Sequence, residues 1–462
     1  MPESQGRFGW RDIRVCPGSP ARQTLDGGRA DPSTPATLLR VPAMTTIADL
    51  PTAVPQPSPH PGMGVREFIA VIAAMMAVNA LAIDAMLPAL PQIGAALKVV
   101  EANQTQLIIT AYLLGFGAAQ LFYGPLSDRF GRKPVLIFGL VVYAASSALA
   151  VFATSLDQMV VARALQGVGS AATRVLAVSI VRDCYSGRHM ARVMSFAFIV
   201  FIAVPVIAPS VGQAIVLVAP WEWIFLVLGL FGLAVAIWSA FRLPETLPVE
   251  KRLPISVRSV AAAFRLVATN RISLGYTLAA SAILGSLFGF INSAQQVFVG
   301  IFDTGKAFPI IFAGIAVFIA ISSLINARIV ERLGTRRVSH TALMGFTAFS
   351  TIHAFIASAG YEQLAIFITL QSAMMFCFGL IMSNFSSMAM DPVGQIAGTA
   401  ASFQGFVTTL VGALLGFYIG QHFDGTVVPL TIGYSVLGFV AIAIVFVTEK
   451  GRMFAPQHAR PN

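Results

Sequence analysis

Apolar segments long enough to cross a bilayer follow one another along most of the chain. A helix rises about 1.5 Å per residue, so roughly 20 residues span a hydrocarbon core of about 30 Å. Stretches that carry charge separate the segments, which lets each one enter and leave the bilayer in turn. The pattern predicts an all-α integral membrane protein with twelve transmembrane helices. The predicted segments cover residues 67–92, 105–126, 133–154, 158–180, 191–217, 222–241, 273–299, 308–327, 338–358, 362–386, 397–420 and 428–448.

The amino-acid composition indicates the same class. Hydrophobic residues make up 56% of the chain and charged residues 11%, and the mean hydropathy is +0.78. A soluble domain carries about 25% charged residues. The net charge of +10 would suggest a nucleic-acid partner in a soluble protein. Here most Lys and Arg residues lie in short loops, where they set topology, so we expect a lipid bilayer and no nucleic acid as partner.

Basic residues gather in every second loop, and this predicts the orientation. The other loops hold only Lys98 and Lys306. By the positive-inside rule the basic loops are cytoplasmic. We therefore expect a multi-pass protein of the inner (plasma) membrane with both termini in the cytoplasm. The basic loops contain Arg129, Arg132 and Lys133, then Arg182, Arg188 and Arg192, then the basic residues of 251–271, and finally Arg328, Arg332, Arg336 and Arg337.

The two ends of the chain differ from the membrane region. Residues 1–62 are rich in Pro, Gly, Ser and Arg and contain no apolar run long enough for a signal peptide, which predicts a disordered extension. Met44 and Met63 are alternative starts for the protein. Residues 450–462 are expected to form a cytoplasmic tail.

The membrane region divides into two similar sets of six segments. The polar stretch 243–272 is the longest between apolar segments. We expect it to be a cytoplasmic linker between an N-terminal half, residues 63–242, and a C-terminal half, residues 273–449. A shift of 203 residues brings the sequence Asp-Arg-Phe-Gly at 128–131 onto Glu-Arg-Leu-Gly at 331–334. Such a repeat is typical of transporters built from two pseudo-symmetric halves.

Residues 124–134, GPLSDRFGRKP, place four charges between two apolar segments. The stretch resembles the signature Gly-x-x-x-Asp-Arg-x-Gly-Arg-Arg/Lys that the major facilitator superfamily carries between its second and third helices. In the second copy Ala327 replaces the leading glycine, and Glu331 and Arg332 keep the charges. The resemblance implies the major facilitator fold and a loop that latches against the other half in the outward-facing state. The matching residues are Gly124, Asp128, Arg129, Gly131, Arg132 and Lys133.

We expect the latch to meet the eleventh segment, which begins after residues 392–397. A carboxylate such as that of Asp128 is stabilised near a helix N-terminus. Farther along the same segment, Gly412, Gly416 and Gly420 form a small-residue face that would let the two halves approach closely.

Two charged residues lie deep in the first half. Asp84 is about 27 Å along the helix axis from Arg66, and Arg163 is about 8 Å from the outer end of the fourth segment. Both therefore fall in the outer half of the bilayer and are placed to pair. Intramembrane charges are functional by default. The structural alternatives are that Asp84 is interfacial and that Arg163 extends to the outer surface.

Residues 163–172, RALQGVGSAA, give Arg163 further weight. They resemble the fourth-helix motif of proton-coupled major facilitators, Arg-x-x-Gln-Gly-x-Gly-Ala-Ala, in which the Arg is implicated in proton transfer. The resemblance implies proton coupling through Asp84 and Arg163. The small residues also predict close helix packing.

The fifth segment resembles an antiporter motif, Gly-x-x-x-Gly-Pro-x-x-Gly-Gly. Pro205 and Pro209 remove backbone donors and predict a bend, and Gly212 permits close packing. A helix kink without any role in export is the alternative interpretation. The sequence departs from the motif at Val204, Ala208 and Gln213.

Several further motifs resemble the bicyclomycin and chloramphenicol resistance branch of the family. They are Leu-Pro-Glu-Thr-Leu at 243–247, Trp-Glu-Trp-Ile-Phe at 221–225, and Asp-Pro-Val-Gly at 391–394. The resemblance implies a proton-driven exporter of small amphipathic compounds that works as a monomer by alternating access. Cys16, Cys184 and Cys377 lack metal-site spacing, so neither a metal nor a cofactor is expected.

A central cavity for such compounds needs apolar and aromatic walls with a few polar groups. One alternative function is proton-coupled import of a metabolite, which predicts paired charges in both halves. The repeat shift instead places Leu287 opposite Asp84 and Ile366 opposite Arg163. The other alternative, a membrane-embedded enzyme, requires clustered Asp, Glu or His residues. The candidate cavity residues are Tyr112, Gln166, Phe288, Asn292, Gln296, Phe376, Asn384 and Gln404.

Overall fold

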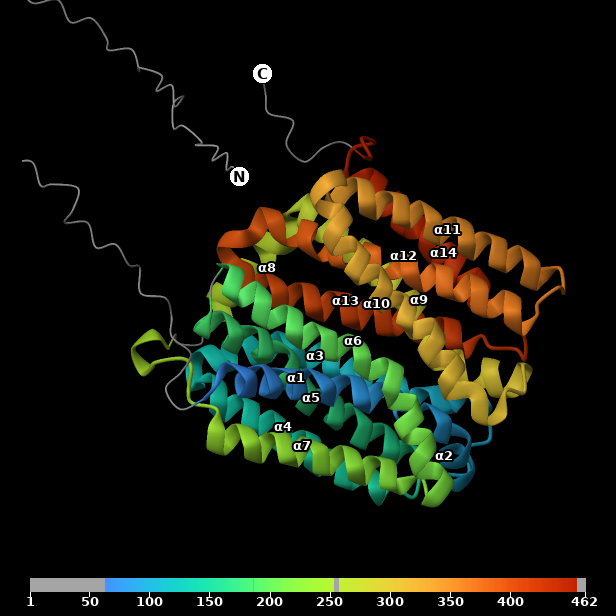
Figure 1. The fold of residues 1–462 in the computed structure, drawn as a ribbon, viewed down its shortest axis with the longest axis horizontal. Coiled ribbons are helices and arrows are strands. Elements are labelled where there is room, and N and C mark those ends of the chain that lie inside the picture. Colours follow the sequence, from blue (N-terminus) through green and yellow to red (C-terminus); the bar gives the residue numbers. More distant parts are fainter. Residues whose placement is uncertain (1–62, 186, 253–256, 455–462) are drawn as a thin grey trace, which may run out of the picture. The chain divides into compact units, whose positions relative to one another are not determined.

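The computed structural model describes residues 63–185, 187–252 and 257–454 (Figure 1). These residues form helices joined by short turns, and no β-strand occurs among them. The predicted extension 1–62 and most of the predicted tail lie outside the described residues. The α-helices of the described chain are α1 (Val65–Asp84), α2 (Leu90–Ala96), α3 (Leu107–Phe130), α4 (Arg132–Val151), α5 (Leu156–Cys184), α6 (Gly187–Val218), α7 (Glu222–Arg242), α8 (Val257–Thr269), α9 (Arg271–Gln295), α10 (Phe308–Leu333), α11 (Thr335–Ser358), α12 (Leu364–Met390), α13 (Ala397–Gln421) and α14 (Val428–Thr448).

The predicted all-α membrane class is confirmed. In the described part of the chain, eleven helical segments are long and apolar enough to cross a membrane. The predicted fifth segment corresponds to α6, in which Ala203–Val218 is a shorter apolar stretch. The predicted linker contains α8, which packs against α13. Figure 1 shows α8 and α2 at opposite ends of the helices.

The first predicted segment, residues 67–92, is broken in its last third. α1 ends at Asp84, a 3-10 turn covers Leu87–Ala89, and α2 begins at Leu90. Pro88 and Pro91 have no backbone N–H and cannot continue the helical hydrogen bonds, which explains the break. The predicted span is confirmed as Val65–Ala96, and the break within it is a feature that hydropathy alone did not predict.

α6 packs closely against this break. A Cβ atom added at Gly212 would collide with the carbonyl oxygen of Ala85. α6 remains helical through Pro205 and Pro209, and Pro209 lies three residues before Gly212. Gly212 therefore lets the α6 backbone reach the residue that follows Asp84.

Residues 124–134 form less of a loop than the sequence suggested. α3 continues to Phe130, and Gly131 alone connects it to α4. Gly131 has φ 99°, a conformation that favours glycine. The same joint recurs between α10 and α11 at Gly334, with φ 81°, 203 residues later. α3 thus runs four residues beyond the predicted segment end at 126, and the Gly131 N–H still donates to the Ser127 carbonyl at 3.1 Å.

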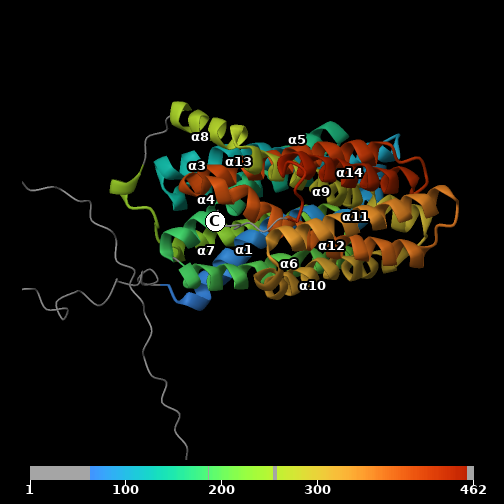
Figure 2. The ribbon, with the colours of Figure 1, turned by 90° about the horizontal axis from the view of Figure 1, so that it is seen from above.

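The helices before α8 pack mainly on one another, and so do those after it. α5 packs on α3 and α4, whereas α9 packs on α13 and α14. The most extensive contacts between the two sets are α3 with α13 and α6 with α10 (Figure 2). The exact boundaries of the two halves stay a prediction.

Replacing Gly212 by Ala tests the α1–α6 contact. We expect Gly212→Ala to destabilise the protein by about 1–3 kcal/mol, because the added methyl group meets a backbone carbonyl. Gly314→Ala is the matched control in α10, since a Cβ there has no neighbour within 4 Å. Thermal unfolding in detergent measures both. Equal melting temperatures for the two variants would contradict the contact.

Candidate functional site

Arg163 is completely buried in α5 and joins three elements. Its Nη2 donates to the Ala82 carbonyl at 2.9 Å, and its Nε donates to the Ile108 carbonyl at 3.1 Å. Its Nη1 donates to Gln166 Oε1. The guanidinium carbon also lies 4.4 Å from the centroid of the Tyr112 ring, a cation–π distance. Arg163 thus connects the end of α1 to α3 and α5 and does not extend to the surface.

Polar side chains continue this buried network through the first set of helices. Gln166 Nε2 donates to Ser147 Oγ at 2.6 Å, which connects α5 to α4. The Tyr112 hydroxyl lies 2.8 Å from Asn79 Oδ1 and 2.6 Å from Ser170 Oγ. Tyr112 and Gln166, predicted to line a cavity, are fully buried and hydrogen-bonded here.

Asp84, the last residue of α1, is only 4% exposed. Its Oδ1 is buried and has no hydrogen-bond partner. Arg163 reaches the carbonyl of Ala82, two residues earlier, and no ion pair joins it to Asp84 among the described residues. The predicted pairing is therefore absent, because the guanidinium donors are taken by backbone carbonyls and Gln166.

Ion pairs surround the joint between α3 and α4. Arg132 is buried and donates to Asp128 at 2.6 Å and to Asp183 of α5 at 2.9 Å. Glu245 accepts from the backbone N–H groups of Arg132 at 2.9 Å and Lys133 at 3.2 Å, so a carboxylate binds the N-terminus of α4. We call Asp128, Arg132, Asp183 and Glu245 the ionic cluster.

The latch contact, which is expected in the outward-facing state, stays a prediction, and the ionic cluster shows how its charges pair in this structure. Asp128 pairs with Arg132 on the next helix, and no hydrogen bond or ion pair joins it to the described side chains of the eleventh segment, α13. Within the motif, Gly124 is the residue that lies against α13. A Cβ atom added there would lie 3.1 Å from the Oγ atom of Ser402 in α13. The charges pair among the first set of helices because Arg132 has carboxylates on both sides. Arg129, Glu331 and Arg332 are exposed.

The predicted small-residue face of α13 lies mostly against α9. A Cβ at Gly412 would lie 3.3 Å from Leu284 Cβ, and one at Gly416 would lie 2.6 Å from Phe288 Cβ. Both neighbours belong to the same predicted half as α13. Only Gly420 meets the other half, through the Gln106 side chain. The expectation that this whole face lies between the halves was therefore wrong.

Four amide side chains connect the two sets of helices at the Gln106 end of α3. Gln106 Nε2 donates to Gln296 Oε1 at 2.6 Å, and Gln296 Nε2 donates to Asn103 Oδ1 at 2.7 Å. Gln421 Nε2 donates to the Asn103 carbonyl at 2.8 Å. α9 changes to a π-helix at Gln296–Ile301, directly at this contact. We call Asn103, Gln106, Gln296 and Gln421 the amide cluster.

The other predicted cavity residues do not meet in one place. Phe376 lines a groove between α10, α11 and α12. Asn384 donates to Asn326 Oδ1 at 2.8 Å and so connects α12 to α10. Gln404 accepts from Ser386 Oγ at 3.4 Å, a weak contact. Asn292 is buried, and neither of its amide atoms has a partner in the described chain.

Sequence reasoning missed several residues of both clusters. Asp183 and Glu245 meet Arg132 only after folding, although Glu245 belongs to the Leu-Pro-Glu-Thr-Leu motif. Asn103, Gln106 and Gln421 lie at segment ends, where polar residues are common, and no spacing connects them. Within the described ranges, no group of three or more His, Cys, Asp or Glu residues is placed to hold a metal.

Known proteins resemble this chain over most of its length. The profile of the Major Facilitator Superfamily matches residues 72–417. The bicyclomycin resistance protein homolog of Haemophilus influenzae is 31% identical over 391 residues, which cover 83% of this chain and 96% of that protein. The multidrug resistance protein MdtL of Salmonella typhimurium is 28% identical, and the match covers 86% of this chain and 100% of that protein. The structure of the xylose transporter XylE from E. coli, in a partially occluded inward-open conformation, matches with a TM-score of 0.66 at 11% identity, with 86% and 99% covered. That last likeness concerns the fold alone.

Arg132→Gln tests the ionic cluster. The change leaves Asp128 and Asp183 without their shared cation, and we expect a loss of about 1–3 kcal/mol in stability. Arg129→Gln is the control, because Arg129 is exposed and a surface substitution costs within about 0.5 kcal/mol. Thermal unfolding compares them. A larger loss in Arg129→Gln would refute the assignment.

Gln106→Ala tests whether the amide cluster closes the space between the two sets of helices. The variant loses hydrogen bonds to Gln296 and to the Gly420 carbonyl, together worth about 1–3 kcal/mol. To measure whether water-soluble reagents reach the interior, the native cysteines are replaced by serine and a single cysteine is placed at position 292, where the native Asn292 is buried. We expect it to react roughly tenfold faster with a hydrophilic thiol reagent. Gln404→Ala is the control, and unchanged labelling in Gln106→Ala would show that the cluster closes nothing.

Proposed function

The chain belongs to the major facilitator superfamily, and from this premise we propose that it exports small amphipathic compounds across the inner membrane in exchange for protons. The proposal includes cytoplasmic termini, a monomeric transporter and alternating access. The basic loops support this orientation. Two relatives carry the names bicyclomycin resistance protein homolog and multidrug resistance protein, which supports drug-like compounds as the cargo.

The observation that carries the proposal is the state of Asp84. A buried carboxylate with an unpartnered oxygen is costly when ionised, so binding a proton there changes the free energy of the site. Intramembrane carboxylates of this kind mark proton pathways. In this proposal Asp84 is the group that binds and releases the proton.

The position of Asp84 provides a route from protonation to movement. The residue ends α1 immediately before the break, and the next residue, Ala85, contacts Gly212 of α6. α6 in turn packs on α10 of the second set. A change of charge at Asp84 therefore acts on an element that contacts the other half. Arg163 would hold the carbonyl of Ala82 in place while Asp84 titrates.

The two clusters lie at opposite ends of α3. The amide cluster binds Gln106 to the carbonyl of Gly420 in α13. Beyond the middle, Gln120 Nε2 donates to Thr409 Oγ1 at 3.2 Å, and Gly124 faces Ser402. In the proposed orientation the amide cluster closes the outer side, and the ionic cluster lies on the cytoplasmic side. Alternating access then requires the amide cluster to open when the cytoplasmic side closes.

Asp84→Asn tests the coupling. The amide has nearly the same shape but carries no titratable proton, so we expect uphill efflux driven by a pH gradient to fall more than tenfold. Downhill exchange of the same compound should persist, because no coupling is required. The measurement uses purified protein in proteoliposomes with ethidium and bicyclomycin as probes. Asp424→Asn is the control, since Asp424 is in an exposed loop and accepts from Thr426.

Wild-type uphill efflux in Asp84→Asn would show that Asp84 does not carry the proton. Gradient-driven uptake toward the cytoplasmic side by the wild-type protein would instead identify an importer. Arg163→Gln is less decisive, because it removes hydrogen bonds to two backbone carbonyls and is expected to destabilise the fold as well.

A further inference from the structure

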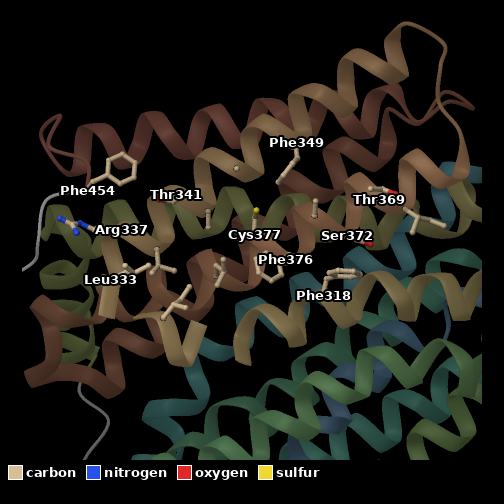
Figure 3. Close-up of a pocket in the computed structure, with 17 residues that line it drawn as sticks. Phe318, Leu333, Arg337, Thr341, Phe349, Thr369, Ser372, Phe376, Cys377 and Phe454 are labelled. Atoms are coloured by element: carbon tan, nitrogen blue, oxygen red, sulfur yellow. The ribbon is translucent and has the colours of Figure 1, made fainter. Parts of the chain in front are cut away.

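A groove of about 1090 Å³ runs between α10, α11 and α12 (Figure 3). Its wall is mainly apolar and aromatic, with Phe318 from α10, Phe349 from α11 and Phe376 from α12. Arg337 and Phe454 lie together at one end, as Figure 3 shows. The transport mechanism proposed above does not use this groove, which we call the α10–α12 groove.

The groove opens on an exposed, apolar face of a membrane-spanning helix, and such a face meets lipid. α10 is the least buried of the spans identified in the described chain, with 28% of its window inside the protein. Phe318 is 38% exposed and Leu333 is 52% exposed, and both line the groove. An occupant can therefore enter sideways from the lipid.

The dimensions of the groove match one leaflet of a bilayer. Arg337 and Phe349 are twelve residues apart on α11, which corresponds to about 18 Å. Half of a hydrocarbon core of about 30 Å is roughly 15 Å. An acyl chain whose headgroup is at the Arg337 end would extend to about the middle of the membrane.

The charged end of the α10–α12 groove favours a lipid with an anionic headgroup. Arg337 is exposed and lines the groove. Its neighbour Arg336 is engaged elsewhere, because it pairs with Glu449 at 3.2 Å. The guanidinium of Arg337 is suited to a phosphate, which it can bind through two N–H groups. The end with Arg337 is also the cytoplasmic end in the proposed orientation, where anionic lipids attract basic side chains.

We propose that the α10–α12 groove binds one anionic diacyl phospholipid, with its phosphate at Arg337 and its acyl chains along Phe376 and Phe349. A transported compound fits less well, because a ligand pocket needs fixed polar groups. Thr369, one of the few hydroxyl groups in the wall, donates to the carbonyl of Ala365 in its own helix. The binding site stands independently of the direction and coupling of transport.

Native mass spectrometry of the full chain in detergent tests the headgroup contact. The probes are dioleoylphosphatidylglycerol, which is anionic, and dioleoylphosphatidylcholine, which is not. We expect Arg337→Gln to weaken binding of the first lipid about fivefold, since a basic side chain near the surface contributes about 1 kcal/mol. Arg332→Gln is the control, because Arg332 is exposed at the end of α10 and does not line the groove. Equal binding of the anionic lipid by Arg337→Gln and the wild type would overturn the headgroup assignment.

A second variant tests the acyl-chain site. Ala373 lines the groove and is partly exposed, so Ala373→Phe fills the space and is expected to remove the bound lipid. Ala234→Phe on the exposed face of α7 is the matched control and should bind lipid as the wild type does. If Ala373→Phe keeps its lipid, the proposal is wrong. If it instead loses bound ethidium or a dimeric species and keeps its lipid, the groove belongs to a substrate or to a second copy.

Discussion

The break in the first span leaves backbone carbonyls without helical donors, and inside a bilayer these groups must find partners within the protein. Arg163 meets this need at Ala82 and adds the carbonyl of Ile108. A planar guanidinium can serve several acceptors at once, which a lysine ammonium does with less geometric fit. Pro88 and Pro91 cause the break, and the buried Arg163 supplies a donor to the Ala82 carbonyl beside it, two residues before Asp84.

The first set of helices is also closely packed around α5, because glycines of α5 meet neighbouring backbones. A Cβ at Gly167 would collide with the carbonyl of Tyr112, and one at Gly169 with the backbone of Tyr143. Such backbone contacts leave little freedom for sliding. Relative motion is then expected where the two sets meet, as at α3 with α13, because that contact includes a side-chain hydrogen bond that can exchange partners.

The fold class and most helix positions followed from hydropathy and charge, because a bilayer imposes a minimum length on every span. The break at Asp84 was missed although Pro88 and Pro91 were visible, since hydropathy continues unchanged through it. Arg163 and Asp84 stood out as isolated intramembrane charges, but the partners of Arg163 did not. A backbone carbonyl such as that of Ala82 has no sequence signature. In the amide cluster, Gln296 and Asn103 are hydrogen-bonded although 193 positions separate them in the sequence.

The amide cluster contains no ionisable side chain, and this matters for a transporter that a proton gradient is proposed to drive. A closure made of carboxylates would loosen whenever protons accumulate on its side of the membrane, which is the condition under which the proposed exporter works. Hydrogen bonds between Gln106, Gln296 and Asn103 keep the same strength across that range of acidity. The outer barrier would thus hold against swings in external pH, and only the movement of the two halves would release it.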